Sequence, residues 1–291
     1  TTTATWAHAW LNEGLTTYME SVHEEKSRGW EAAQLNWINQ QRQAMDADLN
    51  EERPLVYGDT KGRDPILLFF SGHIYPKGAQ LAHQLRRLLG DKVFWAGMHR
   101  FLVDNAYKPV ETKDFAIAME KVSGRDLDWF FDQWAYGIGY PKVQVTRAWD
   151  AAAKTLTVTV RETQTIDATH PFFRFPATVR VITRDSVVRH EVMVTKPDQQ
   201  FAIRLPGKAT SFRFDEGGWL LGTVHTDQTP EELSELAKHD LDMSARWWAL
   251  TTLDSSSSAA ATDARRFMSL NERVPELRAE AVRQVGDHDW N

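Results

Sequence analysis

The chain has 291 residues, of which 42% are hydrophobic and 25% are charged, the balance of an ordinary globular protein. Its net charge of −6 without a basic cluster argues against nucleic-acid binding, and no apolar run is long enough to span a bilayer. Because there is no cysteine, a metal site would have to use His, Asp or Glu ligands. We therefore expect a soluble protein, whether cytoplasmic or exported, and its compartment and oligomeric state stay open.

A first helix, which carries Glu13, is predicted to end near Arg28-Gly29. Its apolar stripe, at helical spacing, consists of Leu11, Leu15, Tyr18 and Val22. Glu13 falls on the face opposite this stripe, where a glutamate is ordinarily solvated. Gly14 is unusual in this position because glycine costs about 1 kcal/mol relative to alanine inside a helix. That cost indicates that another segment approaches the backbone closely at Gly14.

A helical metal site needs two ligands three or four residues apart, because only those side chains converge on one ion. None of the ten histidines lies three or four residues from another. The segment Glu20-Ser-Val-His23 has the spacing used in di-iron helical bundles, but such a site needs a second copy that the sequence does not contain. The residues alone therefore offer Glu13 as a single candidate ligand.

A second helix is predicted over residues 30–49, followed by a loop over 51–65 that contains proline and glycine breakers. The next helix opens at His73-Ile-Tyr-Pro-Lys-Gly-Ala79 and ends at Gly90. Pro76 suits the first helical position and disfavours the α conformation at Tyr75, so the phenol is expected to project from the N-terminal end of this helix. From the pattern alone, Tyr75 is otherwise a half-buried packing residue.

Helical patterns continue to residue 140, and at Pro141 the hydrophobic period changes from 3.6 to 2. The alternating segments lie at 143–145, 156–160, 177–181, 192–194, 201–205 and 212–214, as in an antiparallel β-sandwich. Amphipathic helices return from Asp227, and their arrangement is typical of the start of a helical repeat domain. We therefore predict a multidomain α+β protein divided into residues 1–140, 141–224 and 225–291.

Two of these segments together resemble the M1 family of metalloaminopeptidases, the gluzincins. Trp10-Leu-Asn-Glu-Gly14 is similar to the segment that carries the third zinc ligand of that family, which places this role on Glu13. Tyr75-Pro-Lys-Gly-Ala79 resembles the motif whose tyrosine donates a hydrogen bond to the oxyanion of the tetrahedral intermediate, which places that role on Tyr75. The two motifs occur in the family's order, and the aromatic run that ends at Trp134 is also recurrent in M1 sequences.

The resemblance implies the helical C-terminal half of a thermolysin-like catalytic domain, then a β-sandwich, then the start of a HEAT-like helical domain. It also implies one Zn²⁺ ion and a peptide substrate that loses its N-terminal residue. The family's HExxH helix and GxMEN motif are absent from the sequence, so the chain is expected to be an internal fragment beginning just after the HExxH helix. We expect this fragment to be inactive by itself.

The alternative is a non-catalytic M1-like scaffold whose sheets and helices bind a protein partner. Glu13 and Tyr75 argue against this alternative, because a binding module needs neither a zinc ligand nor an oxyanion donor.

Overall fold

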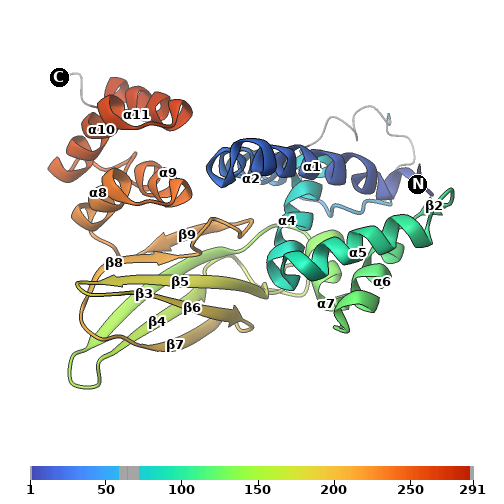
Figure 1. Cartoon of the computed structure of the whole chain (residues 1–291), viewed down its shortest axis with the longest axis horizontal. Helices are drawn as coiled ribbons and strands as arrows, with labels where there is room; N and C mark the ends of the chain where they lie inside the picture. Colours follow the sequence, from blue (N-terminus) through green and yellow to red (C-terminus); the bar gives the residue numbers. More distant parts are fainter. Residues whose placement is uncertain (1, 59–63, 65–71, 289–291) are drawn as a thin grey trace.

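The computed structural model describes residues 2–58, 64 and 72–288 (Figure 1). Its N-terminal half is mainly helical, with the 3₁₀ turn η1 (Trp6–His8), α1 (Trp10–Arg28), α2 (Trp30–Asn50), the π-helical turn η2 (His73–Lys77), α4 (Gly78–Leu89), α5 (Asp91–Asp104), α6 (Thr112–Ser123), α7 (Asp128–Phe131) and the π-helical turn η3 (Asp132–Tyr136). The short strands β1 (Thr2–Thr3) and β2 (Pro109–Val110) pair in parallel. Among these described residues, no helix combines the length and apolarity needed to cross a membrane.

The first two helices agree with their predicted boundaries. The backbone at Gly29 has a φ of 93°, a conformation that glycine adopts without a side-chain clash, and this residue separates α1 from α2. The predicted loop after α2 contains no helix or strand at residues 51–58, whereas 59–63 lie outside the described residues.

Two β-sheets follow the helical half. Their strands are β3 (Lys142–Asp150), β4 (Thr155–Glu162), β5 (Phe175–Thr183), β6 (Val187–Val194), β7 (Asp198–Arg204), β8 (Ala209–Phe214) and β9 (Thr223–Thr226). The strand orders are β7-β4-β3-β9 in one sheet and β6-β5-β8 in the other. Every predicted alternating segment forms a strand, but the purely antiparallel prediction was wrong because β9 pairs in parallel with β3.

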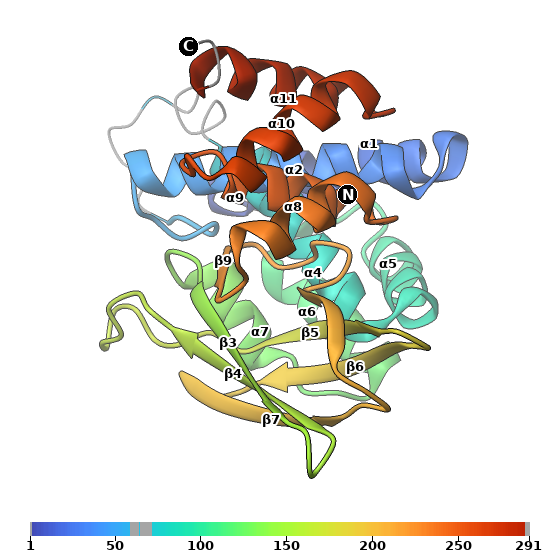
Figure 2. The ribbon, with the colours of Figure 1, turned by 90° about the vertical axis from the view of Figure 1, so that its left-hand side faces the viewer.

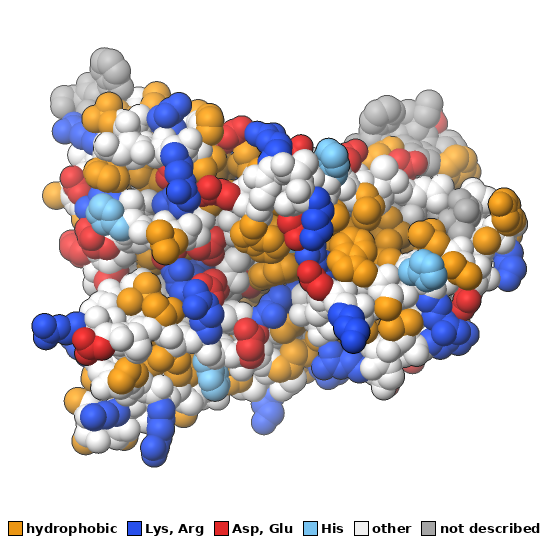
Figure 3. All heavy atoms as spheres, in the orientation of Figure 1, with side chains coloured by type: hydrophobic (Ala, Val, Ile, Leu, Met, Phe, Trp, Pro, Cys, Tyr) orange, Lys and Arg blue, Asp and Glu red, His pale blue; other side chains and the backbone are white. Residues whose placement is uncertain are grey.

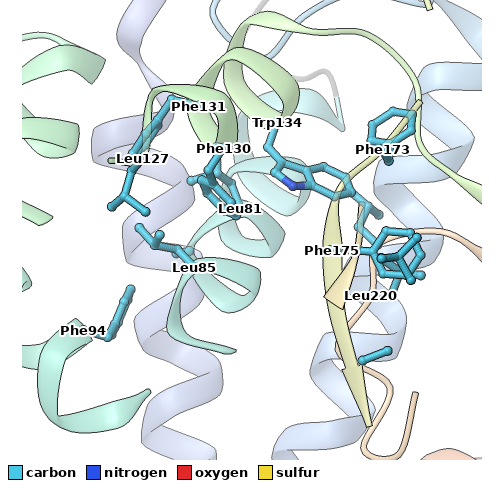
Figure 4. Close-up of a cluster of buried hydrophobic side chains, with 14 of the residues drawn as sticks. Leu81, Leu85, Phe94, Leu127, Phe130, Phe131, Trp134, Phe173, Phe175 and Leu220 are labelled. Atoms are coloured by element: carbon cyan, nitrogen blue, oxygen red, sulfur yellow. The ribbon is translucent and has the colours of Figure 1, made fainter. Parts of the chain in front are cut away.

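A single hydrophobic core joins the helical half to the two sheets. It includes Phe94 of α5, Phe131 of α7 and Val179 of β5. Figure 4 shows Trp134 between the helical aromatics and Phe173, with the Trp134 and Phe173 ring centroids 5.1 Å apart. The core is thus continuous across residue 140, and the proposed domain boundaries stay a prediction.

The C-terminal helices have a core of their own. These helices are α8 (Pro230–His239), α9 (Met243–Thr252), α10 (Ala259–Asn271) and α11 (Pro275–His288), and they lie beyond one end of α2 in Figure 1. Thr229 forms a capping box with Glu232 at the start of α8. Ile38 of α2 belongs to this second core, and α9 packs beside α2 (Figure 2).

Charges of both signs are interspersed on the face shown in Figure 3. Lysine and arginine side chains lie next to aspartate and glutamate side chains there. Elsewhere in the described chain, ion pairs such as Arg147–Glu232 and Arg189–Glu216 likewise join opposite charges. This face has no uniform basic field of the kind that attracts a polyanion.

His83 of α4 is buried between aromatic rings from two parts of the fold. Its ring centroid lies 4.2 Å from that of Trp37 on α2 and 4.2 Å from that of Trp219, which precedes β9. Neither ring nitrogen has a hydrogen-bond partner among the described residues. Burial lowers the pKa of His83 well below its usual value of 6.5, so the ring is neutral in the folded protein.

We expect the stability of the protein to decrease with falling pH partly through His83. In the unfolded chain His83 takes up a proton as the pH falls below about 6.5, whereas the folded state keeps the ring neutral. The unfolded state then binds more protons, and the free energy of unfolding falls by up to about 1.4 kcal/mol per pH unit from this residue. His83→Phe should flatten this dependence between about pH 7 and pH 5 in urea unfolding, with the same substitution at exposed His23 as the control. An unchanged slope in His83→Phe would contradict the neutral buried ring.

Candidate active site

Glu13 lies in the first turn of α1, where a carboxylate is favoured by the helix dipole. The predicted stripe of α1 is buried and Glu13 is half-buried on another face. The N-terminal end of the helix is fixed to α6, because Trp10 Nε1 donates a hydrogen bond to Thr112 Oγ1 at 2.9 Å. Glu13 is therefore held at an anchored helix end rather than on a free surface.

The close approach predicted at Gly14 is made by the start of α4. A Cβ atom on Gly14 would lie 2.8 Å from Gly78 Cα and 2.9 Å from the carbonyl oxygen of Ile74. A Cβ atom on Gly78 would in turn lie 3.0 Å from Gly14 Cα. The two helices thus touch backbone to backbone, and the contact joins the last residue of Trp10-Leu-Asn-Glu-Gly14 to the glycine of Tyr75-Pro-Lys-Gly-Ala79.

Tyr75 lies inside a π-helical turn, and this corrects the prediction that Pro76 starts the helix. In an α-helix the N–H of residue 76 would donate to the carbonyl of Gly72, but proline has no N–H. The N–H of Lys77 donates to Gly72 O instead, at 3.2 Å, and that of Gly78 donates to His73 O. The resulting bonds span five residues, a geometry that is rare and frequent at functional sites.

The structure brings the two predicted site residues together. The phenol of Tyr75 lies near enough to the Glu13 carboxylate for the two groups to interact electrostatically. Burial, followed by the nearby negative charge of Glu13, raises the pKa of Tyr75. Tyr75 therefore stays protonated at neutral pH and keeps its ability to donate a hydrogen bond. Its ring and that of Tyr57 pack against the buried residues Ala9 and Ile74.

Sequence reasoning did not identify a buried carboxylate behind Tyr75. Asp48, near the end of α2, accepts a hydrogen bond from Lys77 Nζ on each oxygen, both at 2.9 Å, and its Oδ1 lies 2.9 Å from His73 Nε2. His73 and Lys77 are each 1% exposed. Burial lowers the pKa of Lys77, and the charge of Asp48 opposes this effect. The only sequence feature that could have indicated a buried carboxylate is Lys77, the lysine of the Tyr75-Pro-Lys-Gly-Ala79 motif.

The described residues do not gather a complete metal site around Glu13. Their one group of three or more potential ligands is Glu120, Asp126 and Asp128, which is acidic and largely exposed. Glu20 and His23, the pair considered for a di-iron site, are both exposed and belong to no such group in the described part of the chain. If Glu13 binds a metal ion, the other ligands are therefore not grouped with it among the described residues.

Comparison with known proteins places the first part of the chain in a family. A model of the peptidase family M1 domain matches residues 1–134, which contain both Glu13 and Tyr75. These residues belong to peptidase family M1. The resemblance found in the two motifs is thereby confirmed, and residues 1–134 are called the M1 segment below.

Several curated proteins similar to this chain are named aminopeptidases, and a solved aminopeptidase structure shares its fold. Aminopeptidase A of Gloydius brevicauda is 30% identical over 142 residues, which are 48% of this chain and 15% of that protein. Aminopeptidase 2 of Candida albicans is 24% identical over 238 residues, 80% of this chain and 25% of that protein. The crystal structure of Legionella pneumophila aminopeptidase A in complex with aspartic acid has the same mixed α/β fold, with a TM-score of 0.76 at 16% identity over 96% of this chain and 33% of that one. The chain thus spans a third or less of each relative's length.

We expect Gly14→Ala to disturb the M1 segment at its closest helix contact. The added methyl group would overlap backbone atoms of Gly78, which cannot rotate away, so overpacking should cost about 1–3 kcal/mol of stability. Separation of the two helices would also move Glu13 away from Tyr75. Urea unfolding measures the first effect, and Gly207→Ala is the control because no atom lies within 4 Å of a Cβ placed there. Equal free energies of unfolding for the two variants would show that the helices at Gly14 and Gly78 can separate without loss of stability.

Proposed function

We propose that Glu13 and Tyr75 form part of the active site of a zinc-dependent aminopeptidase, which removes N-terminal residues from peptides. The observation that supports this proposal most is the proximity of the two residues, which come from separate motifs 62 positions apart and are brought together by the contact between Gly14 and Gly78. Several relatives of the M1 segment are named aminopeptidases, which agrees with this assignment.

Glu13 suits the role of a zinc ligand. A carboxylate oxygen is one of the donors that zinc accepts, and the half-buried side chain is held at an anchored helix end. Catalytic zinc sites use three protein ligands, so one glutamate requires two further ligands, which the described residues do not place beside it. We propose that two histidines complete the set, as the M1 resemblance implies.

The chemistry assigned to Tyr75 follows from its protonation state and position. Zinc in such a site would polarise the scissile carbonyl and activate a water molecule. Tyr75 would donate its phenolic hydrogen to the oxygen on which negative charge develops, because its raised pKa keeps that hydrogen in place. A preorganised donor of this kind lowers a reaction barrier by about 3–4 kcal/mol.

The experiment that tests the proposal is peptide hydrolysis by the full-length protein that contains this chain. We expect it to release the N-terminal residue of a leucine-initiated peptide, to leave the N-acetylated form of that peptide intact, and to lose and regain this activity on chelation and zinc addition. The 291-residue chain alone should show no turnover with zinc. Full-length protein that binds zinc without cleaving either peptide would support the scaffold alternative, and equal cleavage of both peptides would exclude an aminopeptidase.

A further inference from the structure

Asp48 contacts the two residues that flank Tyr75 at equal distance in the sequence. His73 and Lys77 are four residues apart, so in a helical turn they lie on one face, and Tyr75 lies between them on the other. The observed burial agrees, because His73 and Lys77 are 1% exposed and face α2, whereas Tyr75 is half-buried and meets Glu13 of α1. The Asp48 carboxylate therefore binds the buried side of the turn, and Tyr75 projects from the opposite side.

The anchoring contacts are strong ones. Lys77 Nζ binds both oxygens of Asp48 at 2.9 Å, and these are charge-assisted hydrogen bonds in a site that excludes water. The Asp48 side chain is 3% exposed and that of Lys77 is 2% exposed. A buried charge whose partner is removed is costly, so the pair can hardly separate in the folded protein.

The turn that carries Tyr75 has reason to need such an anchor. Pro76 provides no backbone N–H, and the hydrogen bonds that remain span five residues rather than four. The backbone alone thus fixes the orientation of the turn less tightly than a regular α-helix would. The side chains of His73 and Lys77 add a fixed point on α2, a helix that does not itself supply either proposed site residue.

We infer that Asp48 is a positioning residue for Tyr75, which holds the phenol where it donates its hydrogen bond. The effect of Asp48 on turnover rests on the proposed function, whereas its effect on the orientation of Tyr75 does not. We do not assign Asp48 a contact with Glu13 or with substrate. It affects Tyr75 only by binding His73 and Lys77 of the π-helical turn.

Asp48→Asn in the full-length protein should lower kcat by about 10- to 100-fold, because displacement of a reacting group by about 1 Å costs up to this factor. KM and zinc content should stay at the parent values. Asp46→Asn makes the same change two residues away on the exposed side of α2 and should leave kcat unaltered. Asp48→Glu keeps the charge beside Lys77, so it protects folding while moving the anchor by one methylene group, and it should give a smaller loss of kcat.

A double-mutant cycle separates positioning from a general structural role. If Asp48 acts through Tyr75, then Asp48→Asn or Asp48→Glu should have no further effect on kcat in a Tyr75→Phe background. If the double variant instead lost kcat by the product of the two single-variant losses, the inference would be overturned. A parent-like kcat in both Asp48→Asn and Asp48→Glu would also overturn it.

A second readout does not need enzymatic activity. The protein is labelled with 3-fluorotyrosine, and the ¹⁹F resonance of Tyr75 is identified by its loss in Tyr75→Phe. We expect Asp48→Asn to shift or broaden this resonance and Asp46→Asn to leave it in place. An unmoved resonance in Asp48→Asn would refute positioning even in a protein that proves inactive, whereas a shifted resonance in an inactive parent would refute the proposed function alone.

Discussion

Tyr75→Phe should lower kcat of the full-length enzyme by about 100- to 1,000-fold, the effect of removing one oxyanion donor from a preorganised site. The substitution deletes only the hydroxyl group, and the ring can keep its packing against Ala9 and Ile74. The lost group is the one whose pKa is raised by burial and by Glu13, so at neutral pH the enzyme loses a protonated donor. We expect KM to change little, because the hydrogen bond is made to charge that develops in the transition state.

Steady-state kinetics on a leucine-initiated peptide measure this effect. Tyr107→Phe is the matched control, because Tyr107 is fully exposed on the surface and should leave kcat at the parent value. If Tyr75→Phe were as fast as the parent, Tyr75 would be a packing residue, and its position near Glu13 would have no catalytic role.

Glu13→Ala should weaken zinc binding by more than about 100-fold, since even residues that only orient zinc ligands contribute 10- to 100-fold in affinity. The folded structure should tolerate the change, because Glu13 is half-buried and the core stripe of α1 lies on other positions. Glu20→Ala is the control, as it removes an exposed glutamate two turns further along the same helix. Equal zinc affinity of the two variants would remove Glu13 from the ligand set.

The helices and strands could be predicted where one periodic pattern dominates the local sequence. The stripe of α1 is buried as expected, because Leu11, Leu15 and Tyr18 have nowhere else to remove their apolar surface from water. Gly14 was informative for a different reason, because a residue that is unfavourable in a helix indicates a compensating contact. Its partner, Gly78, could not be predicted, because a distance between two helices leaves no periodic trace in either.

The features that sequence reasoning missed depend on contacts between distant segments. Pro76 was expected to begin the helix, yet it lies inside a π-helical turn that starts at His73, because the Gly72 carbonyl finds a donor one residue later. Asp48, near the end of α2, carries no local sequence signal of its role. Its burial depends on Lys77 and His73, which lie 29 and 25 residues away in the sequence.

The candidate site was predicted in its residues but not in its geometry. The motif resemblance selected Glu13 and Tyr75, and the structure adds that the two side chains lie near each other. Glu20 and His23 show the opposite case. Their spacing alone suggested a metal site, but both side chains are exposed. Local spacing is therefore a weak guide to a site unless a second segment supplies its partners.

The central claim is that Glu13 holds a metal ion and Tyr75 acts beside it without binding it. The most direct measurement is the zinc content of the purified full-length protein, determined side by side for the parent, Glu13→Ala and Tyr75→Phe. Our account predicts one zinc ion per parent molecule, loss of zinc in Glu13→Ala, and full zinc content with strongly reduced turnover in Tyr75→Phe. A parent without zinc, or a Glu13→Ala variant that retains it, would contradict the account.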